Sequence, residues 1–277
     1  MAALCYVNGT IGPIRGSSIS VADLGLQRAY GVFDYGRTCQ GKLFHFRDNL
    51  ARLRRSAAAL RLPVLLSDEE FIEIAEQLIE GSDLANPAIR ILLTGGLADG
   101  SSAFEEPTLV VIAEEMVVYP EEIYERGGTM ITAEFQRELP EVKSLNYMHS
   151  IRLDPIRRER GAFDILYHSH HGVTECPRNN FFGFHGDTLV TPKDHVLEGI
   201  TRRIVLEMAR ETYAVEERRV EVAELAEFDE TFITSTSKRV APITKVDDRV
   251  VGAGAVGTRT RWLMERFEEY VADYLDS

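Results

Sequence analysis

Apolar stretches, alternating or continuous, predict short strands along most of the chain. In a half-buried strand apolar side chains recur at every second residue, whereas a strand covered on both faces is apolar throughout. Stretches of these two kinds, bounded by Gly, Pro, Asn or Asp, predict strands at residues 4–8, 31–39, 42–46, 88–94, 108–113, 129–135, 164–168, 171–175, 181–184, 188–190, 231–235 and 249–251. Gln40-Gly41 and His185-Gly186-Asp187 predict turns that join neighbouring strands into hairpins.

Helical periodicity appears between these strands. A helix that Asp48 can cap places apolar residues of the stretch 50–60 on one face, and Ser67-Asp-Glu-Glu70 is a capping-box signature for a helix that ends near Ile79. Three further helices are expected. One follows Lys143 and ends near Arg160, one begins at Gly199, and one runs from about Thr258 to the end.

The order of these elements predicts an α/β (α+β) chain with two domains. A chain of 277 residues, 44% of them hydrophobic, can bury a large core. Residues 119–127 show no clean period and contain Pro120, so they are expected to form an interdomain loop. It would separate a small domain at 1–118 from a larger one at 128–277.

Composition excludes several classes of partner. The net charge of −13 argues against a nucleic acid or an anionic membrane surface as the main partner. The first residues contain no basic segment followed by an apolar stretch, so no signal peptide is expected, and no run of 18 apolar residues occurs in the sequence. Cys5, Cys39 and Cys176 are odd in number and lack a CxxC pattern, which indicates free thiols in a reducing compartment. A cytoplasmic protein is therefore expected.

Two motifs look like ligand-binding motifs, but for each a purely structural role is favoured. Gly252-Ala-Gly-Ala-Val-Gly257 matches GxGxxG, but only 20 residues follow it, too few for the remainder of a dinucleotide-binding unit. We interpret it as a turn into the last helix. His168-Ser-His-His171 could bind a metal, yet strand alternation and a turn should point its imidazoles to different sides, so no metal site is expected.

Lys143 is the first candidate for catalysis. The chain has only five lysines, and this one adjoins Val142 and Leu145. Apolar surroundings disfavour the charged form of a lysine, which makes its amine a nucleophile for carbonyl groups. A surface lysine at the start of a helix is the common alternative, so the neighbouring chemistry decides.

That chemistry fits pyridoxal phosphate. Such a cofactor needs a lysine for a Schiff base, a carboxylate beside its pyridine nitrogen and a phosphate site at the N-terminus of a helix. Glu175, at a strand end, can supply the carboxylate. Gly199-Ile200-Thr201 opens a helix and can hold the phosphate, and Thr236 can add a hydroxyl.

Together, in this order, these residues resemble the class IV, or fold-type IV, pyridoxal-phosphate aminotransferases, and the likeness spans nearly the whole chain. The matching motifs are Val21–Asp34, Asp48–Ser56, Leu197–Arg202 and Phe232–Pro242. The resemblance implies a smaller N-terminal α/β domain and a larger C-terminal, β-barrel-like domain with flanking helices. It also implies a homodimer.

The resemblance assigns roles to individual residues. Lys143 would be the Schiff-base lysine, and Glu175 the partner of the pyridine nitrogen. Arg52, Ile200, Thr201 and Thr236 would hold the phosphate, and Tyr147 would lie beside the ring. The chain departs from the family at Asn49, where His is usual, and at Asp34, where Glu is usual. Both departures are expected to lie outside the set of cofactor-binding residues.

Substrate choice depends on groups that bind a carboxylate, for which arginine offers a rigid fork. The candidates are Arg28, Arg37, Arg90 and Arg178, with Tyr30 near the first. The pairing of Leu-Gln-Arg28-Ala-Tyr-Gly with Pro-Arg178-Asn-Asn-Phe-Phe is similar to the atypical D-amino acid transaminases. This implies a ping-pong exchange of an amino group between a D-amino acid and a 2-oxo acid. A branched-chain L-amino acid transaminase is the rival, and an (R)-amine transaminase, an aminodeoxychorismate lyase and a catalytically silent binding protein remain open.

Overall fold

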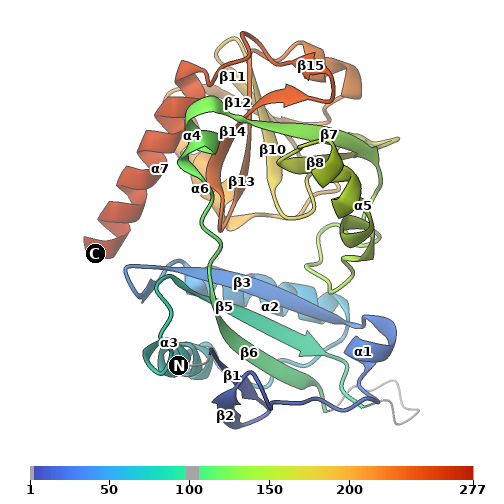
Figure 1. Ribbon diagram of the computed structural model, residues 1–277, viewed down its shortest axis with the longest axis vertical. Helices are drawn as coiled ribbons and strands as arrows, with labels where there is room; N and C mark the ends of the chain where they lie inside the picture. Colours follow the sequence, from blue (N-terminus) through green and yellow to red (C-terminus); the bar gives the residue numbers. More distant parts are fainter. Residues whose placement is uncertain (1–2, 98–105, 277) are drawn as a thin grey trace. The chain divides into compact units, whose positions relative to one another are not determined.

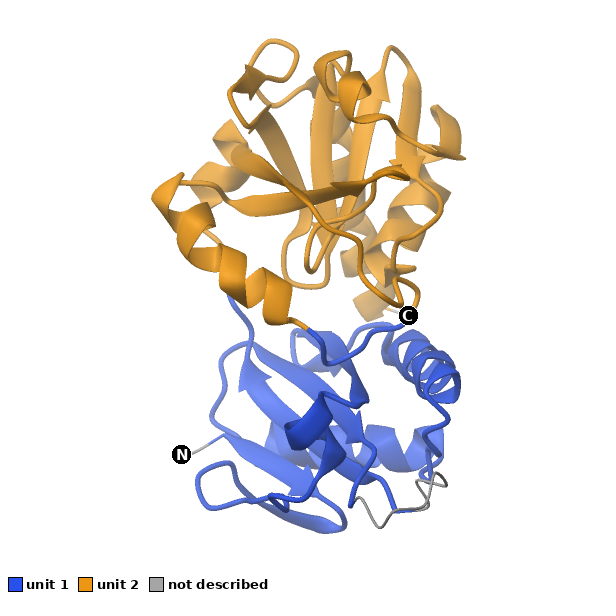
Figure 2. Ribbon diagram, turned by 90° about the vertical axis from the view of Figure 1, so that its right-hand side faces the viewer, with its two compact units in different colours: residues 1–117, 142–146 blue, residues 118–141, 147–277 orange. Residues whose placement is uncertain are grey.

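The computed structural model describes residues 3–97 and 106–276, and divides the chain into two compact units. Unit 1 comprises residues 1–117 and 142–146, and unit 2 comprises residues 118–141 and 147–277 (Figure 2). The short segment that carries Lys143 thus packs with unit 1, although the chain before and after it belongs to unit 2.

Unit 1 is built on an antiparallel sheet of six strands in the order β2-β1-β6-β5-β3-β4 (Figure 1). The strands are β1 (Leu4–Val7), β2 (Thr10–Pro13), β3 (Gly31–Cys39), β4 (Lys42–Leu43), β5 (Pro87–Thr94) and β6 (Thr108–Glu115). The helices are α1 (Leu24–Arg28), α2 (Phe46–Ala59) and α3 (Asp68–Glu80). Helix α2 contacts β3 and α3 contacts β6, and the apolar side chains between them and the sheet form the core of the unit.

Unit 2 contains a mixed sheet of nine strands in the order β12-β11-β10-β13-β14-β7-β8-β9, with β15 paired to β14. The strands are β7 (Gly128–Glu134), β8 (Asp164–Ser169), β9 (Gly172–Val173), β10 (Asn180–His185), β11 (Thr188–Pro192), β12 (Ala214–Arg218), β13 (Glu230–Ser235), β14 (Arg239–Val246) and β15 (Arg249–Val250). Val173 in β9 bridges to Val220, just beyond β12, so the two ends of the sheet approach each other. This curvature confirms the barrel-like sheet expected for the larger domain.

The helices of unit 2 are α4 (Glu121–Arg126), α5 (Met148–Glu159), α6 (Ile200–Ala209) and α7 (Thr258–Asp276), with a 3₁₀ turn, η1, at Val222–Ala226. Helix α6 packs against α7 and β13, and α7 also covers β14. No helix in the described residues is long and apolar enough to cross a membrane.

Several local predictions were wrong. Helix α2 begins at Phe46, not after Asp48: His45 is its N-cap residue, and Asp48 lies in the first turn, 2.7 Å from the His45 ring. The expected strand at 171–175 is reduced to Gly172–Val173. Residues 119–127 were expected to form a loop but contain α4. Pro120 precedes this helix and two glutamates form its first turn, and both features are favourable at a helix N-terminus.

Both interpretations of the motifs can be compared with the structure. Residues 252–257 form turns that lead into α7, as expected. The imidazoles of the histidine cluster are not all separated: the His171 ring lies 3.8 Å from those of His170 and His195. Within residues 3–97 and 106–276, no group of three or more His, Cys, Asp or Glu side chains is placed to hold a metal ion.

Candidate active site

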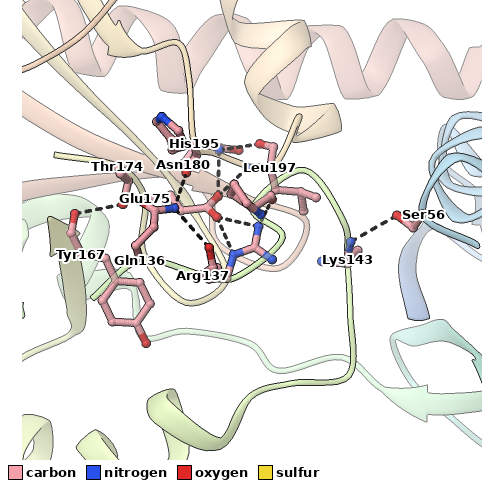
Figure 3. A network of polar contacts seen from close by, with 11 residues as sticks. Ser56, Gln136, Arg137, Lys143, Tyr167, Thr174, Glu175, Asn180, His195 and Leu197 are labelled. Carbon is pink, nitrogen blue, oxygen red and sulfur yellow. Dashed lines mark hydrogen bonds and ion pairs between the residues drawn. The ribbon is translucent and has the colours of Figure 1, made fainter. Parts of the chain in front are cut away.

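The Lys143 segment lies along strand β3 in unit 1. The Phe33 N–H donates to the Lys143 carbonyl at 2.9 Å, and the Lys143 N–H donates to Ser56 Oγ at 3.1 Å. Gly31 permits this approach, because a Cβ there would lie 2.7 Å from a methyl group of Leu145. The half-buried Lys143 extends its Nζ to 4.6 Å from the centre of the Phe33 ring (Figure 3 shows its backbone bond to Ser56). The predicted apolar setting of this lysine is therefore present.

Arg52 lies on α2, one helical turn before Ser56. Arg52 is 5% exposed, its guanidinium makes two hydrogen bonds to Asp34, of 2.9 and 2.8 Å, and Asp34 itself is fully buried. Asn49 donates to the same carboxylate at 2.8 Å. The two departures from the family pattern, Asp34 and Asn49, therefore hold Arg52 in place. They contact the arginine expected to hold the phosphate, and the expectation that they lie outside the set of cofactor-binding residues stays a prediction.

The remaining candidates of unit 1 differ in how strongly they are engaged. Arg90 pairs with both oxygens of Glu114, at 2.5 and 3.0 Å, and its Cζ lies 5.8 Å from the Phe33 ring that Lys143 also contacts. Tyr30 donates its hydroxyl to the Leu60 carbonyl at 2.5 Å. Arg28 ends α1 and is exposed, bonded only to the adjacent carbonyl of Gln27 among the contacts described.

Glu175 is the centre of a buried polar network in unit 2 (Figure 3). The residue is 5% exposed. Arg137 places Nε 2.8 Å and Nη2 2.7 Å from Oε1, while the Leu197 N–H donates to Oε2 at 2.9 Å. Asn180 links the two sides, because its amide donates to the Leu197 carbonyl at 2.8 Å and lies 3.5 Å from Oε2. These donors stabilise the charged form of the carboxylate.

Arg137 was missed by the sequence analysis. It lies six residues before Lys143, in the same connecting segment, and its Nη2 also donates to the Pro140 carbonyl. A lone arginine in a loop has no local pattern that distinguishes it from a solvated one. Only the tertiary structure shows that its guanidinium is matched to Glu175.

The N-terminus of α6 fits a phosphate. Gly199 is its N-cap, and no side chain caps the first turn, so the backbone N–H groups there lack the usual side-chain acceptor. A Cβ at Gly199 would lie 2.2 Å from Asn180 Oδ1, which explains why glycine occupies the position. Ile200 and Thr201 form the first turn, with Thr201 buried. Thr236 lies half-buried in the turn between β13 and β14.

Tyr147 and His149 lie at the start of α5 in unit 2. Tyr147 is half-buried and precedes the first residue of α5. Two residues on, His149 stacks on Phe135 with ring centres 3.8 Å apart and planes 7° from parallel. Burial and the charge of Arg152 lower the pKa of His149.

A cavity of about 480 Å³ opens in unit 2. Its wall includes Arg178, Lys238, Asp164 and the aromatic residues Tyr119 and Phe163. Arg178 is exposed and makes no hydrogen bond or ion pair to any other residue in the described part of the chain. Ser237, which follows Thr236, lines the same cavity, so this arginine and the β13–β14 turn face one space.

The predicted residues thus fall into two groups. Unit 1 gathers Lys143, Arg52 and Arg90 around β3 and α2. Unit 2 gathers Glu175 and the first turn of α6 through Asn180, with Thr236 and Arg178 on neighbouring turns. A buried carboxylate surrounded by hydrogen-bond donors suits the pyridine nitrogen of pyridoxal phosphate. A helix N-terminus without a side-chain cap suits its phosphate.

Comparisons with known proteins agree with this chemistry. Residues 31–246 match the sequence model of the amino-transferase class IV family. The chain is similar to the D-alanine aminotransferase of Staphylococcus epidermidis, with 31% identity over 97% of this chain and 98% of the relative. It is also 31% identical to a putative branched-chain-amino-acid aminotransferase of Methanocaldococcus jannaschii, over 95% of each chain.

Among solved structures, a branched-chain amino acid aminotransferase of the organism abbreviated T.th., determined with pyridoxamine 5'-phosphate, superimposes with a TM-score of 0.88. The two share 27% identity over 98% of this chain and 94% of the other. The fold and the sequence define a fold-type IV enzyme. The chain belongs to the class IV aminotransferases, and it is a transferase that depends on pyridoxal phosphate.

Proposed function

We propose that this aminotransferase moves an amino group between a D-amino acid and a 2-oxo acid. The observation that carries the proposal is Arg178, an arginine without an internal partner among the described residues, on the wall of the cavity in unit 2. An arginine fork of this kind suits the α-carboxylate that every amino acid and oxo acid presents. The similarity to a D-alanine aminotransferase supports the D series.

Arg178 and Arg28 are the proposed carboxylate-binding residues, with Tyr30 beside Arg28. Arg90 ranks below them, because Glu114 already matches its charge with two hydrogen bonds. Arg90 would instead pack beside Lys143, since both side chains lie over the ring of Phe33.

The cofactor-binding roles follow from the two groups. When bound, pyridoxal phosphate supplies an electron sink for the bonds at the substrate α-carbon. Lys143 would attach it, and then use its amine to take the α-proton and return it. Glu175 would accept a hydrogen bond from the pyridine nitrogen. Arg52, Thr201, Thr236 and the N–H of Ile200 would bind the phosphate, and Tyr147 would lie beside the ring.

A branched-chain L-amino acid transaminase is the alternative, supported by the relative from M. jannaschii. Such a substrate needs an apolar pocket for its side chain. The cavity has apolar lining residues, including Tyr119, Phe163 and Ile165, but five charged side chains also line it. The charged lining favours a substrate that presents carboxylates to it.

Half-reactions with single amino donors test the proposal. The yellow, cofactor-loaded protein is mixed with D-alanine, D-glutamate, L-leucine or an (R)-amine, and the rate of loss of the visible band is measured. We expect the D-amino acids to react fastest and Arg178→Ala to slow them at least tenfold, the effect of losing about 1.4 kcal/mol or more of charge-assisted hydrogen bonding. Arg266→Ala, on the exposed face of α7, is the matched control.

Each rival has its own outcome. Faster reaction with L-leucine than with any D-amino acid would replace the proposal with the branched-chain function. Preference for the (R)-amine would indicate an amine transaminase, and pyruvate released from aminodeoxychorismate without an acceptor would indicate the lyase. A loaded protein whose band no donor changes would be a catalytically silent binding protein.

We also propose a homodimer located in the cytoplasm, as the family resemblance implies. Light scattering coupled to size-exclusion chromatography tests the assembly: a mass of twice 31.1 kDa is expected, and a mass of 31.1 kDa at micromolar concentration would contradict it.

A further inference from the structure

Lys238 is a buried lysine to which the sequence analysis assigns no role. It ends the turn that joins β13 to β14, and its side chain is 8% exposed. The turn is held on both sides of this residue: the Lys238 N–H donates to Ser235 Oγ at 3.2 Å, and the Tyr124 hydroxyl donates to the Lys238 carbonyl at 3.2 Å. The side chain therefore projects from a fixed backbone.

The Lys238 ammonium group has more donors than partners. It carries three N–H groups. Asp164 is its one hydrogen-bond acceptor within the described residues, and its other close neighbours are the rings of Phe163 and Tyr119, 4.5 and 5.4 Å from Nζ. Aromatic faces attract a cation but do not accept its hydrogen bonds as an oxygen does. A buried ammonium on a cavity wall thus has donors to offer to a ligand.

Asp164 cannot meet this demand alone, because its oxygens are shared. The Asn179 amide donates to Oδ2 at 2.6 Å, the oxygen that Lys238 also uses, and the Ile165 N–H donates to Oδ1 at 2.8 Å. Asn179 Oδ1 is buried without a partner among the described residues. Asp164 is therefore held in place as the ion-pair partner of Lys238. The Lys238 N–H groups that do not bond to Asp164 remain for a ligand in the cavity.

The charges that line the cavity favour an anion. They are Asp154, Arg157, Asp164, Arg178 and Lys238: three cations against two carboxylates, an excess of one positive charge. Asp154 is matched by Arg157 at 2.8 Å and by Arg158 at 2.7 Å. The positive excess consequently belongs to Arg178, because Asp164 neutralises Lys238, and Lys238 adds hydrogen-bond donors that Asp164 does not use.

We propose that Lys238, supported by Asp164, is a second carboxylate-binding residue of the substrate cavity and acts together with Arg178. The proposal rests on the proposed function, because the carboxylate it binds is that of the amino acid or oxo acid substrate. A purely structural ion pair is the competing explanation. It would cost free energy in desolvation without requiring a cavity or spare donors beside it.

The experiment measures the binding of propionate, a carboxylate that cannot react. Propionate is titrated into the cofactor-loaded protein and its dissociation constant is obtained from the change in visible absorption, with uncharged propionamide as the comparison ligand. Lys238→Met keeps an unbranched side chain one atom shorter and removes its charge, and we expect the propionate dissociation constant to rise about tenfold, in line with a charge-assisted hydrogen bond. The propionamide constant should change less than twofold. Lys245→Met, on the neighbouring strand β14, is the control and should change neither constant.

Asp164→Asn distinguishes the two explanations by sign. It removes the charge that neutralises Lys238, so propionate should bind more tightly. A structural pair predicts that both single variants loosen the site. If Lys238→Met folds poorly because it leaves Asp164 unpaired, the double variant Lys238→Met/Asp164→Asn removes both charges and should still bind propionate weakly.

The outcomes separate this inference from the proposed function. A protein that takes no colour with pyridoxal phosphate, or whose band no amino donor changes, would overturn the proposed function. A coloured protein with a working half-reaction, in which Lys238→Met and the double variant bind propionate as the wild type does, would overturn only the role of Lys238. A rise in the Michaelis constant for the amino donor with a small change in kcat would support it.

Discussion

Arg137 offers a test of the Glu175 network that does not depend on the cofactor. Replacing it with Met keeps most of the volume and removes both hydrogen bonds to Glu175, of 2.8 and 2.7 Å. The two side chains are 16% and 6% exposed, so the pair is largely withdrawn from solvent. Removing one member of a buried pair leaves an uncompensated charge and costs about 3–5 kcal/mol. The Leu197 N–H and Asn180 remain as donors to the carboxylate, so we expect the lower end, about 3 kcal/mol.

Urea unfolding of the protein without cofactor measures this loss. With a slope of roughly 3 kcal/mol per molar urea, the midpoint should fall by on the order of 1 M. Arg266→Met is the control, because Arg266 and its partner Glu269 are 45% and 59% exposed and such pairs contribute only about 0–1 kcal/mol. Glu175→Gln and the double variant with Arg137→Met complete a cycle, in which we expect a coupling of about 1–3 kcal/mol.

Two results would refute the reasoning. One is an Arg137→Met variant that is no less stable than Arg266→Met. The other is a double variant whose loss equals the sum of the two single losses, since the two side chains would then be energetically independent. If the coupling is present, we also expect Arg137→Met to bind pyridoxal phosphate more weakly, because Glu175 would no longer be held in one orientation.

Three further outcomes are expected. Asp34→Ala should destabilise the protein by about 3 kcal/mol, measured in urea, and weaken cofactor binding, because it leaves the buried guanidinium of Arg52 without its carboxylate; unchanged cofactor affinity would argue against Arg52 as a phosphate-binding residue. Burial lowers the pKa of His149 below its usual value of about 6.5. As the pH falls past that value, the unfolded chain therefore binds more protons than the folded one, and the stability of the protein should decrease. His149→Phe should reduce the difference between the urea midpoints at about pH 7.5 and about pH 5.5, and an unchanged difference would contradict this. Burial also raises the pKa of the Cys176 thiol well above its usual value, so a thiol reagent such as Ellman's should label it only after unfolding, and rapid labelling of the native protein, located by peptide mapping, would show that the site opens.

Local sequence patterns were sufficient for most strands and for the start of two helices. The β3 strand was predicted with its observed bounds, and the Ser67 capping box is formed as expected, with reciprocal bonds to Glu70. Strand β14 was missed, since Pro242 removes a backbone donor and normally argues against an interior strand. Its pairings with β13 and β7 decide the matter: β13 is the preceding strand of a hairpin, whereas the pairing with β7 joins residues far apart in sequence.

Some features of the candidate site were likewise predictable from local sequence, and others were not. Lys143, Glu175 and the Gly199-Ile200-Thr201 helix start each have a local signature, because the chemistry of the cofactor requires particular residue types next to strand ends and helix starts. No local sequence pattern, however, shows which charged side chains form ion pairs with one another. Only the tertiary structure shows that Arg137 pairs with Glu175, that Asp34 and Asn49 hold Arg52, and that Arg90 is already bound to Glu114.

The sequence by itself therefore determined the family, the cofactor and the types of residue that serve it. The tertiary structure decided which ionised groups are paired and which, like Arg178 and Lys238, face a cavity with donors to spare. The physical reason is that hydrophobic periodicity and capping act within a few residues along the chain, whereas a charge pair depends on distances in space between residues that folding alone brings together.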